Sequence, residues 1–146
     1  MATNCSTGFR RGILGPQSFQ DLFPDAVIRF YGGTQPGSSD DPAPGPILAQ
    51  ISVSGGLLFE AYQDYMINSP GQAWVIDGIA TGTATWARLC EASDAGGASS
   101  TAPRVDFGVG PDGGIGDFQM FLPGTTDMTP DTSIFVASWW FQIPAY

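Results

Sequence analysis

The side chains of this sequence that could do chemistry near neutral pH are its carboxylates. The chain contains no histidine, and all five of its basic residues are arginine. Without histidine, the commonest general base and metal ligand is missing, which excludes Ser–His and Cys–His nucleophile pairs. Without lysine, Schiff-base and P-loop chemistries are excluded too. The two cysteines, Cys5 and Cys90, are too few for a structural zinc site, so carboxylate chemistry and hard cations held by oxygen atoms remain open.

Two arrangements of acidic residues match known catalytic patterns. Asp131-Thr132-Ser133 matches the Asp-Thr-Ser/Gly triplet of aspartic proteases, which pair two such aspartates. The triplet follows Thr129-Pro130 instead of an apolar strand, so turn chemistry before the last strand is the better interpretation. A glycosidase would need two opposed carboxylates, but no spacing singles out a pair among the central acids, and surface solvation explains each of them. These central acids are Glu60, Asp64, Asp77, Glu91 and Asp94.

The glycine-rich stretch around residue 110 could bind a ligand in two ways. Gly108-Val-Gly-Pro-Asp-Gly113 is a literal GxGxxG motif, but the dinucleotide fingerprint needs a helix after the glycines. Pro111 and two further glycines oppose a helix, so a β-turn is predicted. Asp106, Asp112 and Asp117 could collect a calcium ion, but EF-hand spacing is absent and solvated turn aspartates are favoured. No cofactor is therefore expected.

Tryptophan is abundant and offers candidate binding surfaces. The four residues are Trp74, Trp86, Trp139 and Trp140. Neighbouring side chains along a strand point to opposite faces, so one of the adjacent pair is predicted to lie in the core. The other is predicted to lie on a second buried face or at a subunit interface, where tryptophan is favoured as an anchor. A sugar platform is the weaker alternative for an exposed tryptophan.

The elements that must position these residues are predicted to be short strands. Only 13% of residues are charged, while glycine (20) and proline (12) are abundant, a balance typical of strands joined by tight turns. The predicted strands are Ala26–Tyr31, Ile47–Val53, Leu57–Tyr65, Ala73–Ala80, Thr83–Cys90, Pro103–Val109, Asp117–Leu122 and Ser133–Ile143. In the first, Ile28 and Phe30 are expected on one face, with Val27, Arg29 and Tyr31 on the other. The pattern predicts an all-β antiparallel β-sandwich, with a jelly roll as one topology that fits.

The N-terminal region is predicted to stand apart from the sandwich. Residues 1–8 are small and polar, with little to bury. Residues 1–15 are therefore predicted to form an arm, and residues 16–146 a single β-sandwich domain. Deleting residues 1–15 is accordingly expected to weaken attachment to a partner without unfolding the sandwich.

One short helix is predicted between Phe9 and Phe23. Gly12 and the Gly15-Pro16 pair interrupt this apolar segment, so the helix is expected to begin after Pro16, with proline in its first turn. Pro24 is expected to end it.

The charge balance limits the partners. Fourteen acidic residues against five arginines give a net charge of −9. Because phosphate binding needs a basic footprint, neither nucleic acid nor an acidic membrane surface is expected as a partner. No stretch approaches the roughly 20 apolar residues of a membrane helix, and the first residues lack the apolar run of a signal peptide. We expect folding in a cytoplasm, with both cysteines reduced.

Four segments share features with one family of proteins. They are residues 27–36 (VIRFYGGTQP), 82–89 (GTATWARL), 94–106 (DAGGASSTAPRVD) and 141–145 (FQIPA). In these segments the chain resembles a family of small structural proteins from tailed-bacteriophage virions. The resemblance implies a particle protein assembled in the host bacterial cytoplasm, and it carries no catalytic residues. Capsid decoration, or cement, is the function favoured, with a tail, neck or fibre-attachment component as the alternative.

The expected partners follow from this resemblance. The chain is expected to be non-enzymatic, to bind the major capsid protein or other virion proteins, and to form a homo-oligomer (dimer or trimer). A glycan-binding β-sandwich module and a carboxylate enzyme are the alternatives from other classes. The candidate interface residues are Phe9, Arg10, Arg11, Ile13, Trp139 and Trp140.

Overall fold

The computed structural model describes residues 3–63, 65–110, 119–121, 126–136 and 139–141. Strands account for 36% of the chain and helices for 10%, which confirms the all-β prediction. The strand pairings are antiparallel except for the pairing of β10 with β9. The architecture is sandwich-like, while the jelly-roll order remains a prediction.

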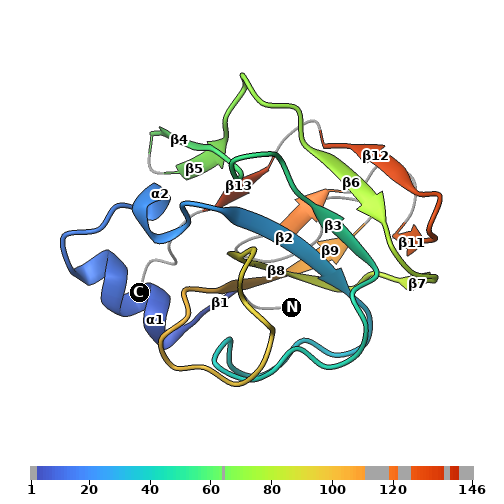
Figure 1. The fold of residues 1–146 in the computed structure, drawn as a ribbon, viewed down its shortest axis with the longest axis horizontal. Helices are drawn as coiled ribbons and strands as arrows, with labels where there is room; N and C mark the ends of the chain where they lie inside the picture. The colour runs from blue at the N-terminus through green and yellow to red at the C-terminus, as the bar shows by residue number, and fades with distance from the viewer. Residues whose placement is uncertain (1–2, 64, 111–118, 122–125, 137–138, 142–146) are drawn as a thin grey trace.

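The strands are short and are joined by turns and loops (Figure 1). Their bounds are β1 Asn4–Cys5, β2 Ala26–Tyr31, β3 Ala49–Ile51, β4 Phe59–Tyr62, β5 Tyr65–Asn68, β6 Val75–Gly78, β7 Gly82–Thr83, β8 Trp86–Glu91, β9 Val105–Gly110, β10 Gln119–Phe121, β11 Asp127–Met128, β12 Ser133–Phe135 and β13 Trp140–Phe141.

One large sheet organises the molecule. Its strand order is β1-β9-β8-β2-β3-β6-β12, and β10 adds to β9 in parallel. The longest pairing joins β2 to β8, from Ala26 opposite Glu91 to Tyr31 opposite Trp86. Strands β11 and β7 form a two-stranded sheet, and β13-β5-β4 form a three-stranded sheet. The centre of the large sheet is therefore built from strands that lie far apart in the sequence.

Three predicted strands are divided in the structure. Leu57–Tyr65 contains a hairpin, because Gln63 takes a positive φ of 55° and turns β4 back into β5. Thr83–Cys90 is split because β7 pairs with β11, whereas β8 pairs with β2 and β9. Ser133–Ile143 is split because β12 pairs with β6 and β13 with β5. Strand β11 was not predicted, and Ile143 lies outside the described residues.

Both faces of the large sheet are buried around β2. Ile28 and Phe30 are fully buried on one face, while Val27 and Tyr31 are each 3% exposed on the other. The predicted alternation of these side chains is correct, since Ile28 pairs with Leu89 and Val27 with Cys90 in the antiparallel register. The face carrying Ile28, the inner face, contacts the main apolar core, and the opposite, outer face is covered by loops.

Aromatic rings fill the space between the inner face, the helices and the three-stranded sheet. Phe19 lies 5.0 Å from Phe59 and Phe9 lies 6.0 Å from Phe141, measured between ring centroids. These edge-on contacts bring β4 and β13 against the N-terminal helices. The aromatic core cluster comprises Phe9, Phe19, Phe23, Phe59, Trp74, Trp139 and Phe141.

The structure contains two helices among the described residues, where one was predicted. Helix α2 (Phe19–Leu22) follows Pro16 as expected and is capped by reciprocal hydrogen bonds between Ser18 and Asp21. Helix α1 (Thr7–Leu14) was missed because two of its residues are glycines. Within the described residues, no helix is both long and apolar enough to cross a membrane.

The glycines of α1 are explained by close packing. A Cβ atom on Gly8 would lie 2.2 Å from the backbone oxygen of Thr101, and one on Gly12 would lie 2.1 Å from Leu22 Cδ2. These distances leave no room for a side chain. The residues that disfavour a helix in isolation therefore allow this helix to pack against the loop around residue 101 and against α2.

The predicted N-terminal arm is wrong for the described residues 3–14. Strand β1 pairs with β9, and Ser6 N donates to Arg104 O at 2.9 Å. Phe9 is 2% exposed and belongs to the aromatic core cluster. The boundary at residue 15 therefore does not separate an arm from a domain, because the segment before it completes both the large sheet and the core.

The two cysteines are free, as predicted. Cys5 lies opposite Val105, which in turn lies opposite Leu89, so Cys5 faces the same side of the sheet as Leu89. Cys90 follows Leu89 in β8 and therefore points to the other side. A disulfide between them would have to pass through the sheet. Burial raises the pKa of Cys5 to about 11 and that of Cys90 to about 12, which keeps both thiols protonated at neutral pH.

Replacing Phe9 by alanine should destabilise the whole domain. Removing a ring from a filled core costs about 3–5 kcal/mol, and the 2% exposure of Phe9 places it in that class. Chemical denaturation followed by tryptophan fluorescence measures the loss. The matched control is Arg10→Ala on the exposed side of the same helix, for which a change within about 0.5 kcal/mol is expected. Equal stability of the Phe9→Ala variant and the wild type would restore the arm model.

Candidate functional site

A buried ion pair occupies the centre of the outer face. Arg88 in β8 lies directly opposite Asp106 in β9. Its Nε donates to Asp106 Oδ1 at 2.7 Å and its Nη2 to Asp106 Oδ2 at 2.9 Å, with both side chains at most 1% exposed. The guanidinium also lies over the ring of Trp86, 5.5 Å from its centroid. Asp106 therefore neutralises a buried cation and is not free to help bind calcium.

A second arginine–carboxylate pair lies beside the first. Arg104 Nε donates to Asp94 Oδ2 at 2.6 Å, and Arg104 Nη2 donates to Asp94 Oδ1 at 2.7 Å. Burial acts to raise the pKa of Asp94, but the hydrogen bonds from Arg104 and from Gly96 N outweigh it. Together with the arginine charges, they hold this pKa below its ordinary value.

These arginines fasten two loops onto the sheet. Arg88 Nη2 donates to Asp41 O and Arg104 Nη1 to Ser39 O, which holds the loop of residues 32–45. Arg104 Nη2 also donates to Gly97 O, and Arg29 donates to Ala92 O, which holds the loop of residues 92–103. Three of the five arginines thus serve as internal supports for irregular backbone.

Glu91 and Asp94 come nearest to an acid–base pair. They line one shallow hollow, and burial raises the pKa of Glu91 while that of Asp94 is lowered. Opposed shifts of this kind separate the two roles in carboxylate enzymes. Here both oxygens of Asp94 bind Arg104, and Glu91 Oε2 accepts from Asp25 N at 2.9 Å. Both groups are therefore engaged in holding loops, which opposes a catalytic role.

The remaining predicted acids are scattered. Glu60 is exposed on the three-stranded sheet, and Asp77 is exposed on β6. Asp131 lies in an exposed turn, where its N–H donates to Thr129 Oγ1, as the turn interpretation predicted. In the part of the chain that the structure describes, no three Cys, Asp or Glu side chains gather as metal ligands. Three further predicted acids lie outside that part: Asp64, Asp112 and Asp117.

The GxGxxG motif begins in a strand. Gly108 and Gly110 belong to β9, where Gly108 lies opposite Trp86. The residues after Gly110, including Gly113 and the predicted turn, lie outside the described residues.

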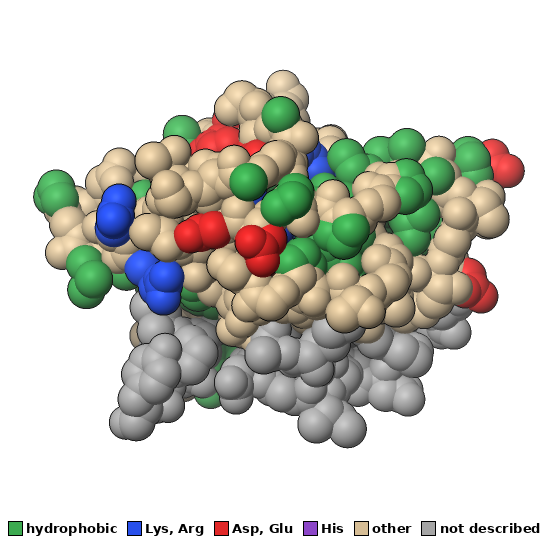
Figure 2. All heavy atoms as spheres, turned by 90° about the horizontal axis from the view of Figure 1, so that it is seen from below, with side chains coloured by type: hydrophobic (Ala, Val, Ile, Leu, Met, Phe, Trp, Pro, Cys, Tyr) green, Lys and Arg blue, Asp and Glu red, His purple; other side chains and the backbone are tan. Residues whose placement is uncertain are grey.

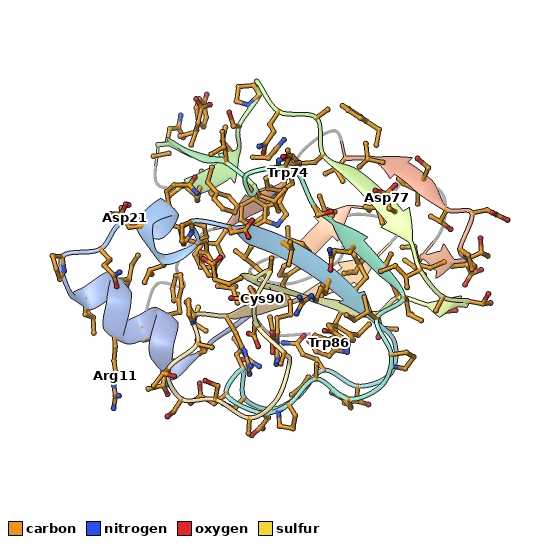
Figure 3. All side chains as sticks on the ribbon, viewed as in Figure 1. Arg11, Asp21, Trp74, Asp77, Trp86 and Cys90 are labelled. Atoms are coloured by element: carbon orange, nitrogen blue, oxygen red, sulfur yellow. The ribbon has the colours of Figure 1, made fainter. Side chains whose placement is uncertain are left out.

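Of the four tryptophans, Trp140 alone is exposed. Trp74, Trp86 and Trp139 are at most 1% exposed, whereas Trp140 is 38% exposed. Trp86 stacks on Tyr31 at 4.6 Å and is therefore not a sugar platform. The prediction that one of the adjacent pair lies in the core is correct: Trp139 packs against Trp74, and Trp140 contacts the ring of Tyr65 edge-on at 5.6 Å. Figure 3 shows Trp74 and Trp86 within the body of the molecule.

Trp140 belongs to an apolar surface on the three-stranded sheet. It lies opposite Ile67, Ile67 lies opposite Glu60, and Tyr62 lies opposite Tyr65, so these side chains share one face. Their neighbours in the same strands, Met66 and Phe141, turn toward the core. Leu58, 48% exposed, extends this surface before β4, and Tyr62 is 58% exposed. We call this surface the aromatic face: Leu58, Tyr62, Tyr65, Ile67 and Trp140, with the exposed carboxylate Glu60 beside Ile67.

A groove of about 380 Å³ runs along the edge of the aromatic face, between Trp140 and Phe135. Phe135 is 62% exposed. The amides in the groove support the fold. Asn68 Oδ1 accepts from Trp139 N at 2.9 Å, and Gln72 Oε1 accepts from Leu58 N and Trp74 Nε1. The groove is thus bordered by apolar rings, and the side-chain oxygens of Asn68 and Gln72 accept hydrogen bonds from the protein itself.

The predicted interface residues divide into two groups. Phe9 and Trp139 are buried in the core, so these two are corrected from interface to structural residues. Ile13 is half-buried and also packs against the core. Arg10, Arg11 and Trp140 are exposed and keep their candidate role. Among the described residues, the prediction missed five exposed large apolar side chains, although alternation from Leu58 through β4 signalled Leu58 and Tyr62. The five are Leu14, Leu58, Tyr62, Ile79 and Phe135.

Comparison with protein-family models, with curated proteins and with solved structures finds no match for this chain. The sequence and the geometry therefore carry the functional inference.

Replacing Asp106 by asparagine should lower the free energy of unfolding, because the change leaves the Arg88 charge buried without its counterion. Breaking one side of a buried ion pair costs about 3–5 kcal/mol. Urea denaturation at neutral pH measures this loss. Asp131→Asn, an isosteric change at an exposed turn, is the control and should stay within about 0.5 kcal/mol of wild type. A loss below about 1 kcal/mol for Asp106→Asn would show that the pair is dispensable.

The Asp94–Arg104 pair should make stability depend on acid pH. Folding lowers the pKa of Asp94, so the ionised carboxylate adds to the free energy of unfolding at pH values above the ordinary aspartate pKa. This stabilisation is lost as the pH falls through the pKa that Asp94 has in the folded protein. The free-energy gap between wild type and Asp94→Asn should therefore be largest near neutral pH and should narrow below about pH 4. Unfolding free energies measured across that range test this. A gap that stays constant into acid would contradict it.

Proposed function

We propose that this chain is a non-enzymatic structural protein that works by being bound into a larger assembly, the virion of a tailed bacteriophage. The observation that carries the proposal is the aromatic face, which presents Trp140, Tyr62 and Leu58 to solvent on the three-stranded sheet. Contiguous exposed apolar side chains of this kind mark docking surfaces on soluble domains. Tryptophan and tyrosine are also the side chains that anchor protein interfaces most strongly.

The groove beside the aromatic face favours a protein partner over a sugar. Sugar sites combine an aromatic platform with polar groups that fix the hydroxyls. The groove offers Trp140 and Phe135 as rings, but Asn68 and Gln72 bind backbone and tryptophan groups of the chain itself. An apolar segment of another subunit would fill such a groove without needing those amides. The glycan-binding alternative is therefore less well supported.

The use of the carboxylates supports a non-enzymatic role. Asp94 and Asp106 neutralise buried arginines, and Glu91 accepts a hydrogen bond from backbone. Groups that stabilise the folded chain in this way cannot take up and release protons without weakening it. Glu91, Asp94 and Asp106 thus stabilise the folded domain, which suits a protein that acts by binding through its surface.

Capsid decoration is the specific role that we propose, with the major capsid protein as partner. The sequence resemblance points to a virion protein, and a small domain with internally fastened loops can cover a junction between capsid subunits without rearranging. A tail, neck or fibre-attachment component is the alternative role on the particle. The copy number of the chain in purified particles distinguishes them: hundreds of copies support decoration, whereas six or twelve copies would overturn it in favour of tail or neck.

The aromatic face should be needed for attachment. Trp140→Ala combined with Tyr62→Ala is expected to lower the amount of protein retained on particles at least tenfold, because two anchor rings are lost. Binding of purified variants to particles that lack the protein, followed by sedimentation, measures this. Trp140→Phe keeps an aromatic ring and should largely preserve binding. Retention of the double variant at wild-type levels, with an unchanged melting temperature, would remove the aromatic face as the docking site.

A further inference from the structure

Two edge strands of this protein are covered by the chain itself. At one end of the large sheet, the loop of residues 32–45 lies over β1, where Ser39 Oγ donates to Asn4 O at 3.0 Å. On the three-stranded sheet, the side-chain amide of Gln20 lies against the edge of β4, where its Oε1 accepts from Phe59 N at 2.9 Å. Covered edges of this kind cannot pair with strands of other chains.

Strand β12, at the other end of the large sheet, is an open edge. Val136 N donates to Trp74 O at 2.9 Å just after β12, and the register places Phe135 opposite Val75. Because hydrogen bonding alternates along an antiparallel pair, the N–H and C=O groups of Ser133 and Phe135 point away from β6. Among the described residues, no group bonds to these outward-pointing atoms. Figure 1 shows β12 beyond β6, at the right-hand side of the molecule.

The groove beside the aromatic face continues from this open edge. Phe135 and Val136 line the groove at the end of β12, together with Trp140 and Pro70. The ring of Phe135 is exposed. A chain that paired with β12 and continued past Phe135 would therefore enter the groove and meet the ring of Trp140. The open backbone edge and the apolar groove thus form one continuous site for an extended segment.

The two ends of β12 differ in chemistry. Ser133 lies opposite Asp77, which is exposed, and Figure 3 shows Asp77 on β6 next to β12. Phe135, at the other end, lies opposite Val75. On the face seen in Figure 2, the right-hand end, where β6 and β12 lie in Figure 1, carries acidic and hydrophobic side chains. This edge therefore suits a segment with a basic side chain near Asp77 and apolar side chains toward the groove.

We propose that β12 binds an extended segment of a partner protein as an additional strand. The backbone of the segment pairs with Ser133 and Phe135, and its apolar side chains lie in the groove against Trp140. Main-chain hydrogen bonds hold such a segment, and the groove selects its side chains. This inference rests on the proposed function, since it specifies how the partner is bound beside the aromatic face.

A free segment fits this edge better than a second copy of the chain does. Two β12 strands paired with each other would share only three residues. In the second copy, Val136 N stays bonded to Trp74 O, which holds that strand in its own sheet and keeps it out of the groove. Both copies also carry a net charge of −9, which opposes their association. Neither constraint applies to a partner segment that is not already part of a sheet.

Ser133→Pro tests the pairing. Proline removes the outward N–H of residue 133 and occupies the space of an added strand, while β12 keeps its hydrogen bonds to β6. Sedimentation with particles that lack the protein should show at least about tenfold less binding, because a partner carbonyl loses its donor. The matched control is Ser133→Ala, which keeps the N–H and should bind within about twofold of wild type. Melting temperatures confirm that both variants fold.

Amide hydrogen exchange of the wild type tests the edge without any variant. In the unbound chain, the amides of Ser133 and Phe135 should exchange faster than those of Ile134 and Val136, which bond to β6. Binding to particles should then slow the exchange of Ser133 and Phe135. Slow exchange of both amides in the unbound chain would overturn the proposal, because the edge would already be covered.

The outcomes separate this inference from the proposed function. If Ser133→Pro binds like Ser133→Ala while the Trp140→Ala and Tyr62→Ala double variant does not bind, the added strand is wrong and the aromatic face remains the docking site. A wild-type chain that does not bind particles overturns both proposals. A purified wild-type chain that sediments as a dimer, and becomes a monomer with Ser133→Pro, assigns the edge to a second copy and overturns the partner segment.

Discussion

The ion pair between Arg88 and Asp106 is the interaction on which the outer half of this molecule depends. Two charges removed from water must satisfy each other, and the direct cross-strand register of β8 and β9 provides that match. The Arg88 guanidinium also contacts the ring of Trp86, and its Nη2 donates a hydrogen bond to Asp41 O. These contacts fix the position of the guanidinium. The loop of residues 32–45 is thereby fixed over the outer face of the sheet, where Val27, Tyr31 and Trp86 are also buried.

The inner half depends on rings instead of charges. Phe9 from α1, Phe59 from β4 and Trp139 next to β13 meet in one aromatic core cluster. These residues come from the beginning, middle and end of the chain, so no continuous segment can be removed as an independent arm. The same cluster orients the three-stranded sheet, because burying Phe141 and Met66 forces Trp140 and Ile67 outward. The exposed aromatic face is thus a consequence of how the core is packed.

Polar groups that might have served chemistry are largely used to hold this architecture. Asp94 and Asp106 compensate arginines, and Asp40 accepts two hydrogen bonds from Thr7. What remains for partners is surface, above all the aromatic face. A protein organised in this way binds through complementary surfaces, which agrees with its proposed role in an assembly.

The sequence by itself determined the all-β class, the alternation along Ala26–Tyr31 and the placement of one of the adjacent pair Trp139 and Trp140 in the core, because these follow from local periodicity. It did not determine helix α1, since Gly8 and Gly12 disfavour a helix until a neighbouring loop packs against them. It also did not determine that Arg88 and Arg104 lie inside and Arg10 and Arg11 outside. The sequence does not indicate whether a given arginine is buried or exposed. That depends on the tertiary strand register, which in the case of Arg88 places the carboxylate of Asp106 directly opposite it.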